Sequence, residues 1–283
     1  YYEIFVRLIT EDGNLTLPGF FMPAAERHNL SNKIDKWVIE NYFVWLNTNS
    51  EFLDKLARCN INITGTSLSG DDFQFFLLNV FEKYHIPHQK ICFEITETAA
   101  IINMNDAIRF IKQFKRLGCT FALDDFGTGY SSLSYLRNAP FDTIKIDQSF
   151  VRGATEEGNN NAAILSAIVG LADALGMETV AEGVEAKDEL ELVTQRGATL
   201  VQGFIFARAM PNADFLERLA DGQLTYDARG PAKYRAARKT VFRRSGLIHE
   251  DNRYKVVMRN LSKTGAMIEG LLDVPLGTQV VLD

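Results

Sequence analysis

Short runs of β-branched and aromatic residues alternate along this chain with longer amphipathic runs. The short runs predict strands at residues 2–8, 59–64, 91–96, 119–125, 143–147, 178–184 and 200–206. The amphipathic runs predict helices at residues 33–46, 72–84, 107–117, 131–137, 162–175 and 187–196. Such alternation is typical of βαβ units, so we expect an α/β fold with a largely parallel sheet.

The number of strands favours a barrel. Seven predicted strands are one fewer than a (β/α)8 barrel contains, and the chain begins at Tyr1 inside a strand-like run. We therefore expect a TIM-type barrel whose N-terminal strand is missing, as part of a longer protein. A doubly wound sheet is the alternative, although no GxGxxG pattern follows the first predicted strand.

The pattern changes beyond the seventh predicted strand. We expect the barrel to occupy residues 1–222 and a basic linker to occupy residues 223–239. Short strands are then predicted at 240–247, 254–260 and 266–269, with no helix between them. Residues 240–283 are therefore expected to form a small all-β module that is incomplete.

Composition and charge narrow the classes of function. The 283 residues are 46% hydrophobic and carry a net charge of -6, which argues against a partner that is a nucleic-acid polymer. Residues 229–263 hold eleven Lys/Arg and two Asp/Glu, so this segment is expected to have different partners from the acidic remainder. Three cysteines without a CxxC pattern, and no apolar run long enough to span a bilayer, favour a reduced cytoplasmic protein.

Polar residues that are costly to bury recur within or just after the predicted barrel strands. In chain order they are Glu3, Asn62, Glu94, Asp124, Asp125, Lys145, Glu182 and Gln202. A carboxylate in an apolar strand is unfavourable unless it is paired or coordinates a cation. We therefore predict that these side chains meet at one site, on the C-terminal face of the barrel.

The donor types in this set indicate a metal site. Carboxylate and amide oxygens favour Mg²⁺ or Mn²⁺ over Zn²⁺. Asp124 and Asp125 are adjacent, so two ions could share them, and paired ions are a known clamp for displacement at phosphorus. Strand alternation places Arg7 on the face of Glu3, where it could bind a phosphate or a neighbouring carboxylate. Glu97 and the glycine-containing segment 124–132 could equally be a helix start and a capped turn.

These residues resemble the EAL domain of cyclic di-GMP phosphodiesterases, from Tyr1 to about Ala220. The matching segments are 3–7 (EIFVR), 60–65 (NINITG), 93–97 (FEITE), 124–132 (DDFGTGYSS), 145–147 (KID), 181–185 (AEGVE) and 202–204 (QGF). The resemblance implies a modified barrel whose first strand is antiparallel. It also implies hydrolysis of cyclic di-GMP to linear pGpG that depends on Mg²⁺ or Mn²⁺, and we expect two ions.

The resemblance also implies roles for individual residues. Glu3, Asn62, Glu94, Asp124 and Asp125 would bind metal, with Glu182 and Gln202 close by. Lys145 would position the attacking water or stabilise charge, and Glu182 is the candidate general base. Arg7 would hold a phosphate, Glu97 would anchor the loop that contains Thr128, and all three are substrate-site candidates. A homodimer and an upstream sensory or GGDEF-type domain are the implied partners.

Three positions depart from the family pattern without removing a ligand. Ile4 and Phe5 replace Ala and Leu of the signature strand, and Phe204 replaces a tyrosine. We therefore expect an active enzyme. The alternatives are a catalytically silent cyclic di-GMP receptor that acts through a partner protein, and a different metal-dependent barrel enzyme with Lys145 as base.

The basic tail resembles a PilZ domain, a small β-barrel that binds cyclic di-GMP. Its (D/N)xSxxG pattern is present as Asn260, Ser262 and Gly265, although these residues could also form a simple hairpin turn. The RxxxR pattern is imperfect, because Lys239 stands where the second arginine is expected after Arg235, and Arg238 is the nearest substitute. Lysine cannot make the bidentate contact of arginine, so ligand binding is expected to weaken or shift to Arg238.

Overall fold

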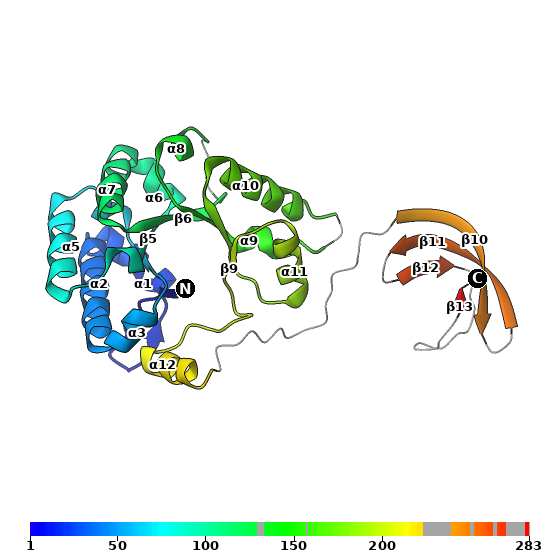
Figure 1. Cartoon of the computed structure of the whole chain (residues 1–283), viewed down its shortest axis with the longest axis horizontal. Helices are drawn as coiled ribbons and strands as arrows, with labels where there is room; N and C mark the ends of the chain where they lie inside the picture. The colour runs from blue at the N-terminus through cyan, green and yellow to red at the C-terminus, as the bar shows by residue number, and fades with distance from the viewer. Residues whose placement is uncertain are drawn as a thin grey trace. The chain divides into compact units, whose positions relative to one another are not determined.

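The computed structural model describes the backbone of residues 1–128, 133–156, 158–222, 239–249, 252–262, 265–269 and 281–282. The chain divides into two compact units, residues 1–231 and 232–283, which are described separately below (Figure 1). No helix within these described residues is long and apolar enough to cross a membrane.

The first unit is built on a seven-stranded sheet in the order β1-β4-β5-β6-β7-β8-β9. These strands are Tyr2–Ile4, Cys59–Asn62, Ile91–Thr96, Thr120–Phe126, Thr143–Ile146, Glu178–Ala181 and Leu200–Val201. All neighbouring pairs are parallel, which confirms the α/β class and a TIM-barrel-like arrangement of strands. The implied antiparallel first strand is not among these seven, because β1 also pairs in parallel with β4.

Helices surround this sheet (Figure 1). They are α1 Pro18–Arg27, α2 Ser31–Thr48, α3 Ser50–Lys55, α4 Gly65–Leu68, α5 Asp71–Tyr84, η1 His88–Lys90, α6 Glu97–Ile102, α7 Met104–Leu117, α8 Leu133–Asn138, α9 Gln148–Val151, α10 Asn161–Leu175, α11 Lys187–Gln195 and α12 Asn212–Ala220. All six predicted helices are present. The sequence analysis missed α1, α12, the short helices and the small hairpin of β2 (Leu8–Ile9) and β3 (Leu15–Thr16).

Aromatic packing fixes the sheet against α7. Phe93 of β5 and Phe121 of β6 contact Phe110 and Phe114 of α7, and all four side chains are fully buried. Their apolar surface supplies much of the hydrophobic stabilisation of this layer. The strands that carry the predicted polar site residues are therefore packed against a buried aromatic layer.

The second unit contains strands only, within the part of the tail that is described. β10 (Lys239–His249), β11 (Asn252–Ser262), β12 (Gly265–Glu269) and β13 (Val281–Leu282) form an antiparallel sheet in the order β12-β11-β10-β13. β10 and β11 pair as a long hairpin with Thr240 opposite Asn260. The predicted tail strands all fall within β10, β11 and β12.

Candidate active site

The carboxyl ends of the parallel strands bring the predicted polar residues together. Asn62 lies opposite Glu94 in the β4–β5 register. Glu182 and Gln202 extend the sheet just past β8 and β9, since their backbone N–H groups donate to Ile146 and Ala181 at 3.1 and 2.9 Å. Parallel strands align their carboxyl ends, so one sheet edge holds the whole set.

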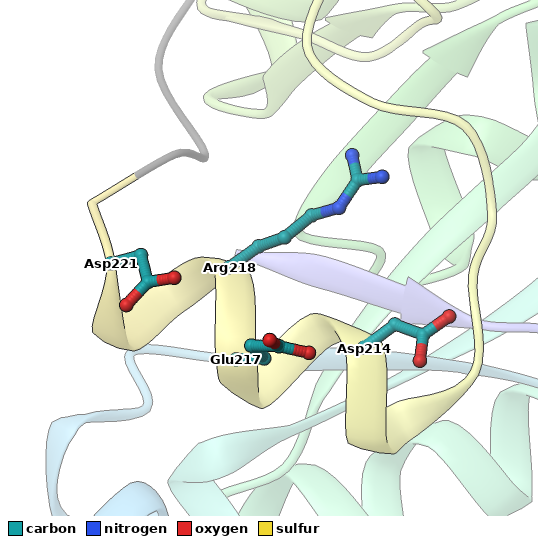
Figure 2. A pocket seen from close by; sticks show the side chains of 4 residues that line it. All are labelled: Asp214, Glu217, Arg218 and Asp221. Atoms are coloured by element: carbon teal, nitrogen blue, oxygen red, sulfur yellow. The ribbon is translucent and has the colours of Figure 1, made fainter.

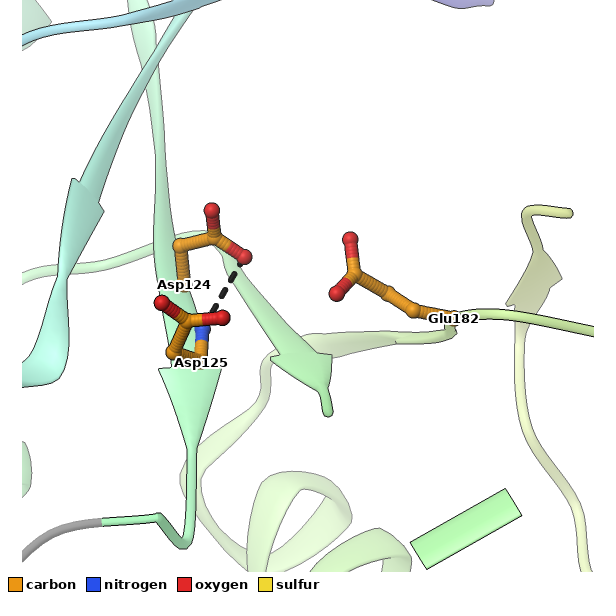
Figure 3. Close-up of side chains that lie close together, drawn as sticks. All are labelled: Asp124, Asp125 and Glu182. Atoms are coloured by element: carbon orange, nitrogen blue, oxygen red, sulfur yellow. Dashed lines mark hydrogen bonds between the residues drawn. The ribbon is translucent and has the colours of Figure 1, made fainter. Parts of the chain in front are cut away.

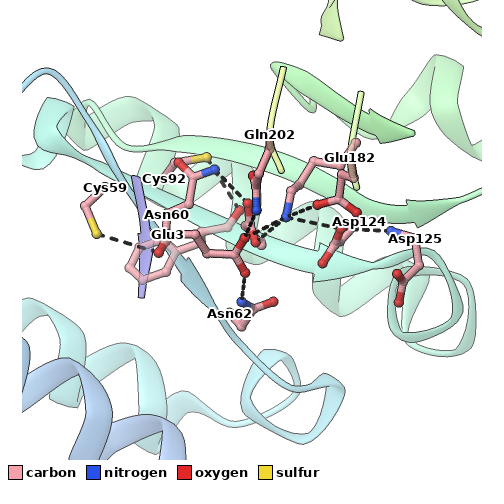
Figure 4. A network of polar contacts seen from close by, with 12 residues as sticks. Glu3, Cys59, Asn60, Asn62, Cys92, Asp124, Asp125, Glu182 and Gln202 are labelled. Atoms are coloured by element: carbon pink, nitrogen blue, oxygen red, sulfur yellow. Dashed lines mark hydrogen bonds and ion pairs between the residues drawn. The ribbon is translucent and has the colours of Figure 1, made fainter. Parts of the chain in front are cut away.

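Lys145 is the centre of this site. Figure 4 shows the side chains around it, among them Glu3, Asp124 and Glu182. Its side chain is only 1% exposed, and its ammonium group lies 2.8 Å from Glu94, 2.8 Å from Glu182, 3.1 Å from Glu3 and 3.3 Å from Asp124. One buried cation thus contacts four carboxylates from four different strands or strand ends. This ammonium offsets only one of the four negative charges.

Amide side chains complete the ring. The Gln202 amide donates to Glu3 Oε2 at 2.7 Å, and the Asn62 amide donates to Glu3 Oε1 at 2.5 Å. Gln202 follows the last strand and Glu3 lies in the first, so their hydrogen bond joins side chains from the two edge strands of the sheet. Asn60, one alternation before Asn62 in β4, donates to Glu94 Oε1 at 2.6 Å.

Asp124, Asp125 and Glu182 lie close together at one side of the site (Figure 3). One carboxylate oxygen from each lies within 4.8 Å of the others. The Asp125 backbone is left-handed, with φ of 53°, and its N–H donates to Asp124 Oδ1 at 2.9 Å. An all-oxygen set of this kind fits a hard divalent cation.

Burial and mutual repulsion raise the pKa of three carboxyl groups. Burial raises the pKa of Glu94 well above the ordinary value, and Lys145 only partly opposes it. Burial and the charge of Asp124 raise the pKa of Glu182 to about 7. Burial, with Asp124 beside it, also raises the pKa of Asp125. These groups retain protons at neutral pH more readily than free carboxylates, and a bound cation would remove that need.

The pKa values of Glu3 and Lys145 shift in the directions that favour their charged forms. Burial acts to raise the pKa of Glu3, but Lys145 and the hydrogen bonds from Gln202 and Asn62 hold it below the ordinary value. Burial acts to lower the pKa of Lys145, but Glu94 and the other carboxylates raise it well above the ordinary value. Lys145 is therefore an ammonium ion at neutral pH.

Glu97 lies behind the loop that follows β6. Its side chain is buried and accepts a hydrogen bond from the Gly127 backbone at 3.0 Å. Thr128 is exposed, and its hydroxyl donates to the Asp125 carbonyl at 2.9 Å. Residues 129–132 of the matching segment lie outside the described residues. Glu97 thus contacts the loop backbone, whereas the Thr128 side chain is exposed.

Strand alternation does not place Arg7, because β1 ends at Ile4. The Arg7 guanidinium donates to the Val6 carbonyl at 2.9 Å and lies 5.7 Å from the centre of the Phe5 ring, which is 48% exposed. The prediction that Arg7 shares the face of Glu3 through a continuous strand was therefore wrong. The chain leaves the sheet early, and Phe5 is exposed rather than packed beside Glu3.

Only some of the predicted ligand residues of the tail lie within the described residues. Arg235 and Arg238 lie outside the described residues. Lys239 opens β10, Asn260 and Ser262 lie in β11, and Gly265 opens β12 directly opposite Ser262. The (D/N)xSxxG pattern therefore contributes residues to the end of β11 and the start of β12, which pair antiparallel.

A shallow hollow elsewhere on the first unit is lined by Asp214, Glu217, Arg218 and Asp221 of α12 and its C-terminal end (Figure 2). Its volume is about 260 Å³. None of these residues belongs to the ring around Lys145, and three exposed acidic groups on one helix are ordinary surface chemistry.

A family model described as "EAL domain" matches residues 1–209. The chain therefore belongs to the EAL domain family. Proteins of this family depend on divalent metals, and the acidic cluster described above could hold one. The match covers every residue of the ring around Lys145.

Several named relatives are cyclic di-GMP phosphodiesterases, which are hydrolases. Cyclic di-GMP phosphodiesterase PdeB of Shewanella oneidensis is 36% identical over 217 residues, which are 76% of this chain and 25% of that protein. Cyclic di-GMP phosphodiesterase PdeF of Escherichia coli is 34% identical over 219 residues, which are 77% of this chain and 29% of that protein. The chain thus spans less than a third of these relatives.

Solved structures share the fold. The PaMucR phosphodiesterase in complex with c-di-GMP has a TM-score of 0.69 and 30% identity, over 75% of this chain and 86% of that chain. The FimX EAL domain from Pseudomonas aeruginosa bound to c-di-GMP has a TM-score of 0.66 and 25% identity, over 72% and 81%. Both of these neighbours are c-di-GMP complexes.

The sequence analysis missed Asn60 as a member of the site. The signal was available, because Asn60 precedes Asn62 by two residues and side chains two apart share a face of a strand. Asn60 was quoted only as part of the matching segment, and its contact with Glu94 depends on the β4–β5 register.

Proposed function

We propose that this chain hydrolyses cyclic di-GMP to linear pGpG and needs Mg²⁺ or Mn²⁺, two ions per site. The observation that carries the proposal is the buried Lys145 among four carboxylates at the ends of parallel strands. The phosphodiesterase names of the relatives support the reaction, and the c-di-GMP complexes among the structural neighbours support the substrate.

The residues present fit the proposed ions. Metal would be held by Glu3, Asn62, Glu94, Asp124 and Asp125, with Glu182 and Gln202 close by. Bound divalent ions would offset the excess negative charge of the ring and polarise the phosphate. All these donors are oxygens, which is why we assign Mg²⁺ or Mn²⁺ rather than a softer ion.

The side chains then have separate tasks in the reaction. Glu182, with a pKa of about 7, accepts the proton of the attacking water as a general base. The water oxygen forms a bond to phosphorus, the bond from phosphorus to the 3′ oxygen breaks, and that oxygen takes up a proton from solvent, to which Glu182 later returns its own proton. Lys145 carries a permanent positive charge at this point, which stabilises charge that develops on the phosphate.

Three further residues are proposed to serve the substrate. Arg7 is a long cationic side chain shortly after the end of β1 and would bind a phosphate. Thr128 lies exposed at the start of the loop after β6. Glu97 would keep that loop in place through its bond to Gly127. These assignments follow the family motif and the contacts described above.

Product analysis tests the function. The purified chain is incubated with cyclic di-GMP and either Mg²⁺ or Mn²⁺, and nucleotides are separated by chromatography. We expect linear pGpG from the parent chain and from Glu185→Gln, and none from Glu182→Ala. Glu185 is a matched control, because it is a nearby glutamate that forms an exposed pair with Arg152 at 3.3 Å. Binding without product in the parent chain would support the receptor alternative.

We propose that the chain belongs to a cytoplasmic protein that forms a homodimer and carries an upstream sensory or GGDEF-type domain. For the second unit we propose a PilZ-like module that also binds cyclic di-GMP. The support is the position of Asn260, Ser262 and Gly265 where β11 and β12 pair. The test is nucleotide binding by Glu182→Ala, with and without the residues from Gly230 onward. Two bound nucleotides with the tail and one without it are expected, and equal stoichiometry would contradict this assignment.

A further inference from the structure

A half-buried asparagine lies next to one carboxylate of the ring. Asn60 precedes Asn62 by two residues in β4, so both side chains project from the same face of the sheet. The Asn60 amide donates to Glu94 Oε1 at 2.6 Å, and Lys145 donates to Glu94 Oε2 at 2.8 Å. Each oxygen of Glu94 therefore has its own donor.

The two asparagines of β4 act on different carboxylates. Asn62 donates to Glu3, whereas Asn60 donates to Glu94. Glu94 is only 1% exposed, so water has little access to replace a lost donor. Without Asn60, Glu94 would keep its hydrogen bond with Glu3 and its contact to Lys145, which itself is shared among four carboxylates.

Retaining an amide at this position has an energetic cost. Asn60 Oδ1 is buried, and no described residue donates to it. A buried acceptor without a partner destabilises a fold, and an apolar side chain of similar shape would avoid this cost. The amide is therefore poorly explained by packing alone and well explained by its contact with Glu94.

We propose that Asn60 is a positioning residue, which fixes the Glu94 carboxylate for the divalent cation; this inference rests on the proposed function. Residues that hydrogen-bond to metal ligands hold them in the orientation that the ion requires. Asn60 acts through Glu94 and need not touch substrate. Its loss should therefore weaken metal binding while turnover at saturating metal changes much less.

The test compares Asn60→Leu with Thr143→Val. Leucine resembles asparagine in size and lacks the donor. Thr143 is a matched control, because it lies two residues before Lys145 in β7, is 2% exposed, and has a hydroxyl without a partner among the described residues. Binding of Mn²⁺ without nucleotide is measured by electron paramagnetic resonance, together with thermal unfolding.

We expect Asn60→Leu to weaken Mn²⁺ binding by about 10- to 100-fold. Thr143→Val should leave the affinity unchanged. The Mn²⁺ concentration for half-maximal turnover should rise by the same factor, with a much smaller change in kcat. A purely structural role would lower the melting temperature without this change in the affinity of the folded protein.

Distinct results separate the two proposals. Equal Mn²⁺ affinity in Asn60→Leu and the parent chain overturns this inference. Mn²⁺ binding by the parent chain without hydrolysis overturns the proposed function and leaves this inference standing. Absence of Mn²⁺ binding by the parent chain overturns both. If Asn60→Leu does not fold, Asn60→Ser, whose hydroxyl is too short to replace the amide, provides the same comparison.

Discussion

At the scale of single residues, Lys145 decides whether the carboxylate ring can exist without a metal. Isolated buried carboxylates are strongly unfavourable, and removing one partner of a buried ion pair costs about 3–5 kcal/mol. Lys145 is 1% exposed and contacts four carboxylates, so it stabilises the metal-free fold as well as serving the proposed reaction. These two roles can be separated by measuring stability in a chelator.

Lys145→Met is predicted to lower stability, increasingly so as pH rises. The pKa of Glu94 is raised well above its ordinary value and that of Glu182 to about 7, and Lys145 lowers both. A carboxyl whose pKa is raised by folding stabilises the fold below its unfolded pKa and loses that contribution as pH rises through its folded pKa. Without Lys145 these pKa values rise further, so the deficit should grow from about pH 4.5 to above pH 7.

The measurement is urea unfolding in EDTA at pH 5.5 and pH 8. We expect a loss of about 3 kcal/mol or more at pH 8 and a smaller loss at pH 5.5. Lys115→Met is the control, since Lys115 pairs with Asp142 at 2.6 Å but is 30% exposed and outside the ring. An equal deficit at both pH values in Lys145→Met would contradict the prediction.

At the scale of elements, Asp35 of α2 holds the turn that follows the Asn62 strand. Its Oδ2 accepts hydrogen bonds from the Thr64 backbone at 2.8 Å, the Thr64 hydroxyl at 2.7 Å and the Ser67 hydroxyl at 2.7 Å. Asp35 is buried, so water cannot readily replace it. A helix on the outside of the sheet thus fixes the start of α4 and the end of β4.

Asp35→Ala is predicted to destabilise the first unit by about 2–4 kcal/mol, because three donors lose a buried charged acceptor. Urea unfolding measures this loss. Ser31→Ala is the matched control: Ser31 is also buried on α2, but it makes one hydroxyl contact to Thr66 at 3.0 Å, and about 1 kcal/mol is expected. Similar losses in both variants would show that the three contacts to Asp35 contribute little.

Gly203 allows the loop after β9 to approach the loop after β8. A Cβ at Gly203 would lie 2.0 Å from the Val184 carbonyl oxygen. Gly203→Ala should therefore break the bonds from Val184 to Gln202 and from Ile205 to Val184, both 3.1 Å, and cost about 3 kcal/mol. Thermal unfolding compares this variant with Gly170→Ala. A Cβ at Gly170, an exposed position of α10, would meet no atom within 4 Å, so that variant should be more stable than the parent chain by up to about 1 kcal/mol. A stable Gly203→Ala protein would refute the steric argument.

Much of this architecture could be predicted from sequence, for reasons visible in individual elements. α7 has a strong apolar stripe, with Phe110 and Phe114 on one side, and Gly118 ends it in a left-handed conformation, so both its type and its end were predictable. α4 and α9 have four residues each, which is too short for helical periodicity to emerge. The early end of β1 at Ile4 was also hidden, because the apolar run continues past it.

The site was predicted better than its internal contacts. Recurrence of polar residues at strand ends was enough to group Glu3 with Glu94 and Lys145, and the structure does bring them together. The role of Asn60 depends on which oxygen of Glu94 it contacts, and the displacement of Arg7 depends on where the chain leaves the sheet. Both are tertiary details, which a one-dimensional pattern does not encode.

At the scale of the whole molecule, chemistry and charge are divided between two parts of the chain. Every residue of the ring around Lys145 lies within residues 1–231, the first compact unit, and the EAL match ends at residue 209. The eleven Lys/Arg of residues 229–263 fall almost entirely in the second unit. If the first unit contains a complete site, its metal binding and turnover should not require the tail.

A chain that ends at residue 222 is therefore predicted to fold, to bind Mn²⁺ and to hydrolyse cyclic di-GMP with kcat/KM close to that of the full chain. Its sheet, its aromatic layer and its ring of carboxylates all lie before that point, so truncation keeps every contact of the ring described above. Kinetics of both chains at saturating Mn²⁺, with thermal unfolding to confirm folding, check this. Each chain also carries Glu182→Ala as its inactive control. A folded truncated chain that binds Mn²⁺ but loses most of its kcat/KM would show that residues 223–283 take part in turnover, and would make the tail a regulator of this enzyme rather than a separate binding module.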